Sequence, residues 1–192
     1  MTRIAIIVGS TRPNRNSEQV ANWVYEIAAH RDDAHFDLVD LKEVALPHLD
    51  EPMPPLYGQY QNGHSTQWAS TVASFDGFVI VTPEYNHSIP GVLKNAIDYV
   101  GAEWFNKAVG FVSYGVDGGV RAVEHLRGIA GVLHLADVGP QVSLRLATEF
   151  ENYSVFKPGD NSRKALNDML DDVVSWSDAL ASLRAASVAS AA

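Results

Sequence analysis

The chain has 192 residues, of which 46% are hydrophobic, and this length is that of one ordinary globular domain. Its 14 Lys and Arg against 23 Asp and Glu give a formal net charge of -9, which argues against a nucleic-acid-binding protein because a phosphate backbone requires clustered cations. The sequence has no cysteine, so disulfides, thiolate metal sites and cysteine nucleophiles are excluded, and redox chemistry would need a cofactor. We therefore expect a single domain over residues 1–192 that does not bind nucleic acid.

Neither a signal peptide nor a membrane anchor is expected. The first apolar run, from Ile4 to Val8, is too short for the hydrophobic region of a signal peptide and leads directly into a polar loop. No stretch is long and apolar enough to span a bilayer. We predict a cytoplasmic protein that does not associate with membranes.

Buried strands alternate with amphipathic helices along the chain. The continuous β-branched run from Ile4 to Val8 predicts a strand covered on both faces of a parallel sheet. Apolar residues at helical spacing from Val20 to Ala28 predict a helix, and Asn16 with Gln19 three residues later indicates a capping box at its start. Further strands are expected at 36–41, 77–81, 108–112 and 138–146, and further helices at 65–75, 90–100, 120–129 and 165–183.

This alternation predicts an α/β fold. Five strands separated by helices need crossover connections, which are right-handed almost without exception. We therefore expect a three-layer sandwich around a five-stranded parallel sheet with the flavodoxin-like strand order 2-1-3-4-5. Pro90 is expected at the first position of its helix with Ser88 as the N-cap, and the Ala- and Ser-rich tail from about Ala185 is expected to fray.

The connection from Glu43 to His64 is unusually long and contains four prolines with apolar and aromatic residues between them. Loops of this length in compact domains are usually functional or disordered. The apolar content indicates that this proline-rich loop packs either against a second subunit or against its own domain.

Three loops, which follow the first, third and fourth strands, carry unusual polar residues at the sheet edge where ligands bind. The first loop, from Gly9 to Ser17, combines hydroxyl, amide and guanidinium groups just before a helix N-terminus, as a phosphate site requires. It contains neither GxGxxG nor GxxxxGK(S/T), so a phosphate monoester fits better than a dinucleotide or ATP. The alternative is that these polar groups only cap the helix.

The second loop, from Thr82 to Gly91, places two prolines, an aromatic residue and amide-type groups directly after a buried strand. A stiff wall of this composition offers a stacking surface and backbone hydrogen bonds to a flat heteroaromatic ring. The third loop, from Ser113 to Gly119, is expected to meet the other two at the same edge.

Three sequence runs resemble the NADPH-dependent FMN reductase family of flavodoxin-like proteins, which also includes quinone, azo-dye and chromate reductases. The runs are GSTRPNRNSEQVANWV, VTPEYNHSIPGVLKNAIDYV and FVSYGVDGG. The similarity extends from about Arg3 to about Leu144, and the order of the runs matches the predicted alternation of strands and helices. The segment from Leu146 to Ser162 resembles nothing in the family.

The resemblance implies an FMN whose phosphate lies in the first loop and whose ring lies along the second and third loops. Phosphate contacts are expected from Ser10, Arg12, Arg15, Asn16 and Ser17, and ring contacts from Pro83, Glu84, Tyr85, Asn86, His87, Ser113, Tyr114 and Gly115. The resemblance also implies that hydride passes from NADPH or NADH through N5 of FMN to a small acceptor such as a quinone, a free flavin or an azo compound.

No catalytic side chain is expected, because the hydride chemistry belongs to the cofactor. His87 is a weak candidate for a proton donor, since imidazole titrates near neutrality, although a loop histidine bonded to backbone is the more economical interpretation.

Glu84 has two interpretations, catalysis or a salt bridge to a partner subunit. Asp117 departs from the family pattern and lies either near the ring edge or in solvent. The histidines lack ligand spacing, so we predict no metal site.

Two other functions stay open at this stage. The acidic chain suits a flavodoxin-type electron carrier that docks on basic partners, and a reductase could instead supply reduced flavin to a monooxygenase. Turnover of NADPH without a partner protein would exclude the carrier, and the affinity for FMN would distinguish a prosthetic group from a substrate.

The resemblance further implies a homodimer or a dimer of dimers, with the helix from Leu93 to Val100 and the proline-rich loop at the interface.

Overall fold

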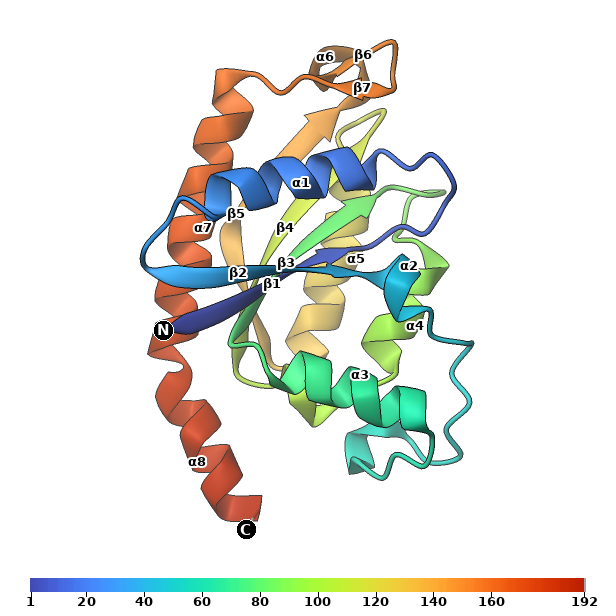
Figure 1. The fold of residues 1–192 in the computed structure, drawn as a ribbon, viewed down its shortest axis with the longest axis vertical. Coiled ribbons are helices and arrows are strands. Elements are labelled where there is room, and N and C mark those ends of the chain that lie inside the picture. Colours follow the sequence, from blue (N-terminus) through green and yellow to red (C-terminus); the bar gives the residue numbers. More distant parts are fainter. Residues whose placement is uncertain (192) are drawn as a thin grey trace.

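The computed structural model describes the backbone of residues 1–191 and the side chains of residues 1–186. Its main sheet has five parallel strands in the order β2-β1-β3-β4-β5, so the predicted α/β class and strand order are confirmed (Figure 1). These strands are β1 (Thr2–Val8), β2 (Ala34–Asp40), β3 (Gly77–Pro83), β4 (Lys107–Gly115) and β5 (Leu135–Arg145). A separate antiparallel hairpin is formed by β6 (Phe150–Glu151) and β7 (Val155–Phe156).

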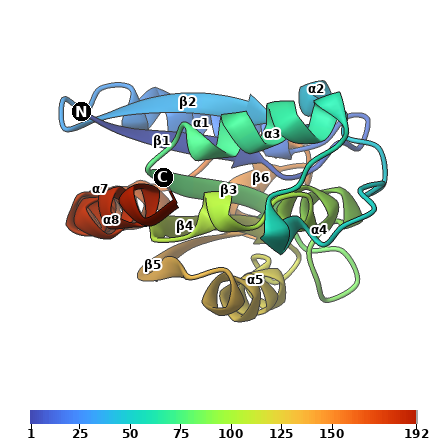
Figure 2. The same ribbon diagram turned by 90° about the horizontal axis from the view of Figure 1, so that it is seen from below.

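Helices cover both faces of the main sheet and complete the predicted three layers (Figure 2). The α-helices are α1 (Ser17–Ala28), α2 (Leu41–Val44), α3 (Gly63–Ala73), α4 (Gly91–Asp98), α5 (Val120–Val132), α6 (Leu146–Glu149), α7 (Asp160–Ala179) and α8 (Ala181–Ala191). Short 3-10 helices lie at η1 (Pro55–Tyr57) and η2 (Ala102–Trp104). Among the residues described, no helix combines the length and the apolar character needed to cross a membrane.

Alternation along the central strands divides the core in two. Ile4 and Ile6 of β1 pack with α1 and α7, whereas Ala5 and Ile7 of the same strand pack with α3, α4 and α5. Successive side chains of a strand point to opposite faces, so a strand that is covered on both sides must be apolar throughout. This is why β1 and β3 appear in the sequence as unbroken apolar runs.

The predicted capping box at the start of α1 is wrong. Asn16 is the N-cap residue, but its side chain makes no capping hydrogen bond. Its Nδ2 atom instead donates to the carbonyl of Tyr153 at 3.1 Å, and Gln19 Nε2 donates to the carbonyl of Ser154 at 2.8 Å. Both side chains therefore bind the β6–β7 hairpin, which lies far away in the sequence.

The start of α4 also differs from the prediction. Pro90 is the N-cap residue and Gly91 is the first residue of the helix. The Ser88 hydroxyl does not cap α4, since it forms a hydrogen bond of 2.8 Å with Nδ1 of His125 on α5. Ser88 is held in a tight turn with Tyr85, and this turn directs its side chain toward α5.

The expected helix at 165–183 is two helices. The chain leaves α7 at Leu180 and enters α8, where Arg184 donates to the Ser177 carbonyl at 2.9 Å and to Asp76 Oδ1 at 2.9 Å. The fraying expected from about residue 185 falls within α8 and stays a prediction, and residue 192 lies outside the described residues.

The proline-rich loop packs against its own domain. Asn95 of α4 donates to the Pro47 carbonyl at 2.8 Å and accepts from the Leu49 N–H at 3.0 Å. The Tyr60 hydroxyl donates to Glu103 of η2 at 2.8 Å. These bonds support the second of the two interpretations for this loop, although Leu56 and Tyr57 at its tip stay exposed.

The buried Lys107 makes stability depend on pH. Its ammonium group donates to the carbonyls of Val72 and Ala73 at the end of α3, at 2.8 and 3.4 Å, and lies 5.5 Å from the centre of the Phe78 ring. Burial, reinforced by the charge of Arg184, lowers the pKa of Lys107 from 10.5 to about 8. The unfolded chain therefore binds more protons than the folded protein between these values, and stability rises with pH across that interval.

We expect Lys107→Met to abolish most of this rise. The wild-type free energy of unfolding should increase by about 1–2 kcal/mol between pH 7.5 and 9.5 through this one group, and the variant should lack that increase. Urea unfolding at four pH values measures the two slopes, and stopping at 9.5 avoids the buried Tyr99 and Tyr114 and the half-buried Tyr60, whose raised pKa values affect stability at higher pH. The exposed Lys164→Met variant should keep the wild-type slope. Equal slopes in all three proteins would refute the assignment.

Candidate functional site

The three loops meet at the carboxyl edge of the sheet, as their positions after β1, β3 and β4 require. The first loop is joined to β3 by the Gly9 N–H, which donates to the Val81 carbonyl at 2.8 Å. It is joined to the second loop by a hydrogen bond of 3.0 Å between the hydroxyls of Ser10 and Tyr85. The second loop is joined to β4 by the Glu84 N–H, which donates to the Tyr114 carbonyl at 3.1 Å.

The first loop is closely packed where it leaves β1. A Cβ atom on Gly9 would lie 2.8 Å from the Val81 carbonyl oxygen, so only glycine fits there. Ser10 and Ser17 are fully buried on either side of the exposed residues 12–14. The Ser17 hydroxyl approaches Tyr114 yet makes no hydrogen bond of normal geometry to a described residue. A buried hydroxyl without a partner is costly unless a ligand supplies one.

The two arginines of the first loop have opposite environments. Arg15 is buried, donates to Asp40 through both terminal nitrogens and donates to the Ser10 carbonyl at 2.6 Å. Arg12 is exposed, and its guanidinium group makes no ion pair with a described residue. In this structure Arg15 therefore shapes the loop, whereas Arg12 is available to an anion.

The second loop folds into a tight turn. Tyr85 and Ser88 exchange backbone hydrogen bonds of 2.8 and 3.0 Å, and between them Asn86 and His87 have φ angles of 50° and 68°. Left-handed backbone at two successive non-glycine residues is strained, and such strain gathers at functional sites. Both side chains are exposed, and among the described residues neither backbone N–H has an acceptor. The turn therefore presents two free N–H donors.

The third loop is closed by glycines and by an ion pair that the sequence did not reveal. The Ser113 hydroxyl donates to the Gly118 carbonyl at 2.7 Å, and Gly119 has a φ of 75° with no room for a Cβ atom against Ser113 and Tyr114. Arg121, at the start of α5, donates to Glu84 at 2.6 Å through its side chain and at 3.1 Å through its N–H.

Glu84 and Asp117 share Arg121 as their partner. Glu84 therefore forms its salt bridge within its own chain, which replaces the suggested bridge to a partner subunit. Asp117 lies 2.8 Å from the other terminal nitrogen of Arg121, and the hydrogen bond and charge of that guanidinium lower the pKa of the Asp117 carboxyl. Asp40 and Arg121 were both missed from the sequence, because neither lies in a loop of unusual composition.

Tyr114 forms the floor between the first and third loops. It is nearly buried, and this burial raises the pKa of its hydroxyl to about 12. The hydroxyl lies beside Ser17, and the ring lies 6.1 Å from the ring of Phe150 in β6. Pro83 and Gly115 complete the ends of β3 and β4 on either side of this floor. The structure thus brings the thirteen predicted site residues to one edge, and their contacts with a cofactor stay a prediction.

The site has the donor set that a phosphate and a flat ring would need. Among the described residues it combines an arginine without an ion pair, a buried hydroxyl without a hydrogen bond of normal geometry, a helix N-terminus and backbone N–H groups without acceptors. Within the described part of the chain, no group of three or more His, Cys, Asp or Glu side chains is placed to hold a metal ion.

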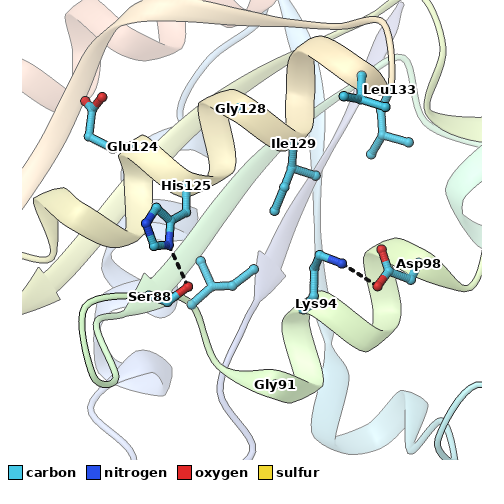
Figure 3. A pocket seen from close by; sticks show the side chains of 11 residues that line it. Ser88, Gly91, Lys94, Asp98, Glu124, His125, Gly128, Ile129 and Leu133 are labelled. Atoms are coloured by element: carbon cyan, nitrogen blue, oxygen red, sulfur yellow. Dashed lines mark hydrogen bonds and ion pairs between the residues drawn. The ribbon is translucent and has the colours of Figure 1, made fainter.

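A separate cavity of about 860 Å³ lies between α4 and α5, on the far side of the second loop. Figure 3 shows Ile129 of α5 and Leu133, the C-cap residue of that helix, facing the ion pair of Lys94 and Asp98 on α4, with His125 pointing toward Ser88. Its lining is mainly apolar with a charged rim, so it differs in character from the loop site.

Known proteins resemble this chain over most of its length. The family model described as NADPH-dependent FMN reductase matches residues 2–149. The NAD(P)H-dependent FMN reductase ntnL of Nectria sp is 35% identical over 175 residues, covering 86% of this chain and 87% of that protein. The 2-hydroxy-1,4-benzoquinone reductase of Burkholderia sp is 30% identical over 186 residues, covering 91% and 95%.

Solved structures agree with the fold. The flavoenzyme NAD(P)H:(acceptor) oxidoreductase FerB from Paracoccus denitrificans superimposes with a TM-score of 0.72 at 22% identity, covering 93% of this chain and 98% of that chain. The apo form of the NADH:FMN oxidoreductase EMOB superimposes with a TM-score of 0.68 at 20% identity, covering 91% and 89%. At these identities the likeness establishes the fold alone.

Proposed function

We propose that the three loops bind FMN and that NAD(P)H reduces a small acceptor there. The basis of this proposal is that the chain belongs to the NADPH-dependent FMN reductase family and is an oxidoreductase. The observation that supports this most is that one loop holds both Arg12, which has no ion pair with a described residue, and the buried Ser17, whose hydroxyl makes no hydrogen bond of normal geometry to a described residue. Together they match the charge and the acceptors of a phosphate monoester.

In this proposal each loop has a distinct task. Arg12, Ser10 and Ser17 hold the phosphate, while Arg15 acts through Asp40 to keep the loop in shape. The free N–H groups of Asn86 and His87 face the ring, where donors stabilise the negative charge of a reduced flavin. FMN held by these loops would supply the redox chemistry, which is hydride transfer between NAD(P)H and the acceptor.

In this proposal the side chains of the protein fix the shape of the binding site and the access of substrates to it, and they form no covalent bond with the substrates. The ion pair of Glu84 with Arg121 fixes the second loop against the start of α5, so the wall keeps its position when substrates exchange. His87 lies exposed at the tip of the turn and is the candidate side chain for a proton donor. The acceptor we favour is a quinone, since a benzoquinone reductase is among the relatives.

We also propose that the protein acts in the cytoplasm as a homodimer or a dimer of dimers. A second copy would cover the proline-rich loop and the cavity between α4 and α5. This cavity has an apolar floor and a rim with both charge signs, which suits a self-complementary interface (Figure 3). Val132 beside it is 78% exposed, and Leu56 and Tyr57 are exposed at the loop tip. Sedimentation of the wild type and of Val132→Glu tests this.

The decisive experiment is an anaerobic visible spectrum of the purified protein with FMN and then NADPH. Bound flavin that bleaches rapidly without a partner protein is the expected result, and transfer of the electrons to a benzoquinone should restore the absorbance. FMN binding without bleaching would favour the flavodoxin-type carrier. Weak binding with rapid bleaching would favour a reductase that supplies reduced flavin to a monooxygenase. Absence of FMN binding would overturn the proposed function.

A further inference from the structure

The β6–β7 hairpin lies directly beside the first loop. It follows α6 at the carboxyl end of β5, and Figure 1 shows it next to the end of α1 at which the first loop enters the helix. The family model ends at residue 149, one residue before the hairpin begins.

Three hydrogen bonds attach the hairpin to the start of α1. Asn16 Nδ2 donates to the Tyr153 carbonyl at 3.1 Å, and Gln19 Nε2 donates to the Ser154 carbonyl at 2.8 Å. The Phe156 N–H donates to Gln19 Oε1 at 3.1 Å. Gln19 thus uses both ends of its amide, and the first turn of α1 is bonded to the hairpin from two positions that are three residues apart.

Aromatic packing attaches the same hairpin to the floor of the site. The Phe156 ring lies 5.3 Å from Trp23 of α1 in an edge-to-face arrangement and 4.9 Å from Phe150. Phe150 in turn lies 6.1 Å from Tyr114, whose hydroxyl adjoins Ser17. The hairpin therefore bridges α1 and β4, the two elements from which the first and third loops extend.

The hairpin is itself held rigidly. Its three-residue loop has Asn152 and Tyr153 at φ angles of 51° and 59°, which is strained for a bulky residue such as tyrosine. Glu149 anchors the base, because its carbonyl accepts from the Lys157 N–H at 2.7 Å and its carboxylate from the Gly159 N–H at 2.9 Å. A strained turn persists only when its surroundings hold it, and the two bonds to Glu149 supply such support at the base of the hairpin.

We propose that the β6–β7 hairpin is a clasp that holds the first loop in its phosphate-binding shape, with Asn16 and Gln19 as positioning residues. This inference rests on the proposed function and assigns Asn16 to the support of the loop through its amide nitrogen. A loop that is already ordered loses less entropy when its ligand binds, so the clasp raises affinity for the phosphate end of FMN without touching the ring.

The test compares FMN with riboflavin, which lacks the phosphate. Gln19→Ala removes two bonds to the clasp from a residue outside the predicted contact set, and it should weaken FMN about tenfold while riboflavin changes less than about twofold. Glu26→Ala, an exposed change on the same helix, is the matched control and should leave both affinities as in the wild type. Unchanged FMN affinity in Gln19→Ala, or an equal loss for both flavins, would overturn the proposal.

Amide hydrogen exchange without any ligand gives an independent readout. The Arg12 N–H, bonded to Ser10 Oγ, and the Val20 N–H, bonded to the Asn16 carbonyl, should exchange about tenfold faster in Gln19→Ala than in the wild type or the control. Equal exchange rates would overturn the clasp even if FMN affinity fell. Should the wild type bind no FMN, the proposed function fails, and the exchange rates still decide whether the hairpin holds the loop.

Discussion

Arg12→Ala is expected to weaken FMN binding by about 10- to 100-fold, the range that a charge-assisted contact to a phosphate normally contributes. The side chain is exposed, and its removal breaks no ion pair with a described residue. The free energy of unfolding should therefore change by less than about 0.5 kcal/mol, as for an ordinary surface substitution. Quenching of flavin fluorescence gives the affinity, and urea unfolding gives the stability.

Two comparisons make this result specific to the phosphate. Riboflavin should bind Arg12→Ala as it binds the wild type, because it carries no phosphate. Arg12→Lys should recover part of the FMN affinity, since lysine keeps the charge but not the forked donor geometry of arginine. An Arg12→Ala protein that binds FMN as tightly as the wild type would remove Arg12 from the phosphate site.

Arg15→Ala is expected to have the opposite profile, with a loss of about 3 kcal/mol in the free energy of unfolding. The Arg15 side chain is only 5% exposed, and its removal leaves the carboxylate of Asp40, itself 20% exposed, without its cation. The Ser10 carbonyl also loses the donor that lies 2.6 Å away. Urea unfolding measures the loss, and FMN affinity should fall only because the first loop changes shape.

A double-mutant cycle isolates this ion pair. The double variant Arg15→Ala/Asp40→Asn should be more stable than the sum of the two single changes predicts. Each single change leaves one buried charge without its partner, whereas the double change removes both charges. Lys164→Ala breaks an exposed ion pair with Asp168 and should cost less than about 1 kcal/mol. If Arg15→Ala were as mild as Lys164→Ala, the burial of the Arg15 pair would contribute nothing to stability.

The different environments of Arg12 and Arg15 are a feature of the site that the sequence could not predict. Both stand in one loop of suitable composition, and the resemblance to the family assigns both to the phosphate. Only the structure shows that β2 brings Asp40 beside Arg15 and leaves Arg12 free. The hairpin is a similar case, because the spacing of Asn16 and Gln19 predicted a local cap, whereas both side chains bind backbone well over a hundred positions away.

The fold followed from local patterns because a strand covered on both faces must be apolar throughout, and parallel strands need crossover helices. The unbroken runs of β1, β3 and β4 and the helices between them carry that information within a few residues, and the three loops were located for the same reason. The partners of Arg15, Asn16, Gln19 and Glu84 were decided by tertiary structure alone. Each partner lies 25 to 137 positions away, so it depends on how separate elements pack, and no local spacing encodes that arrangement.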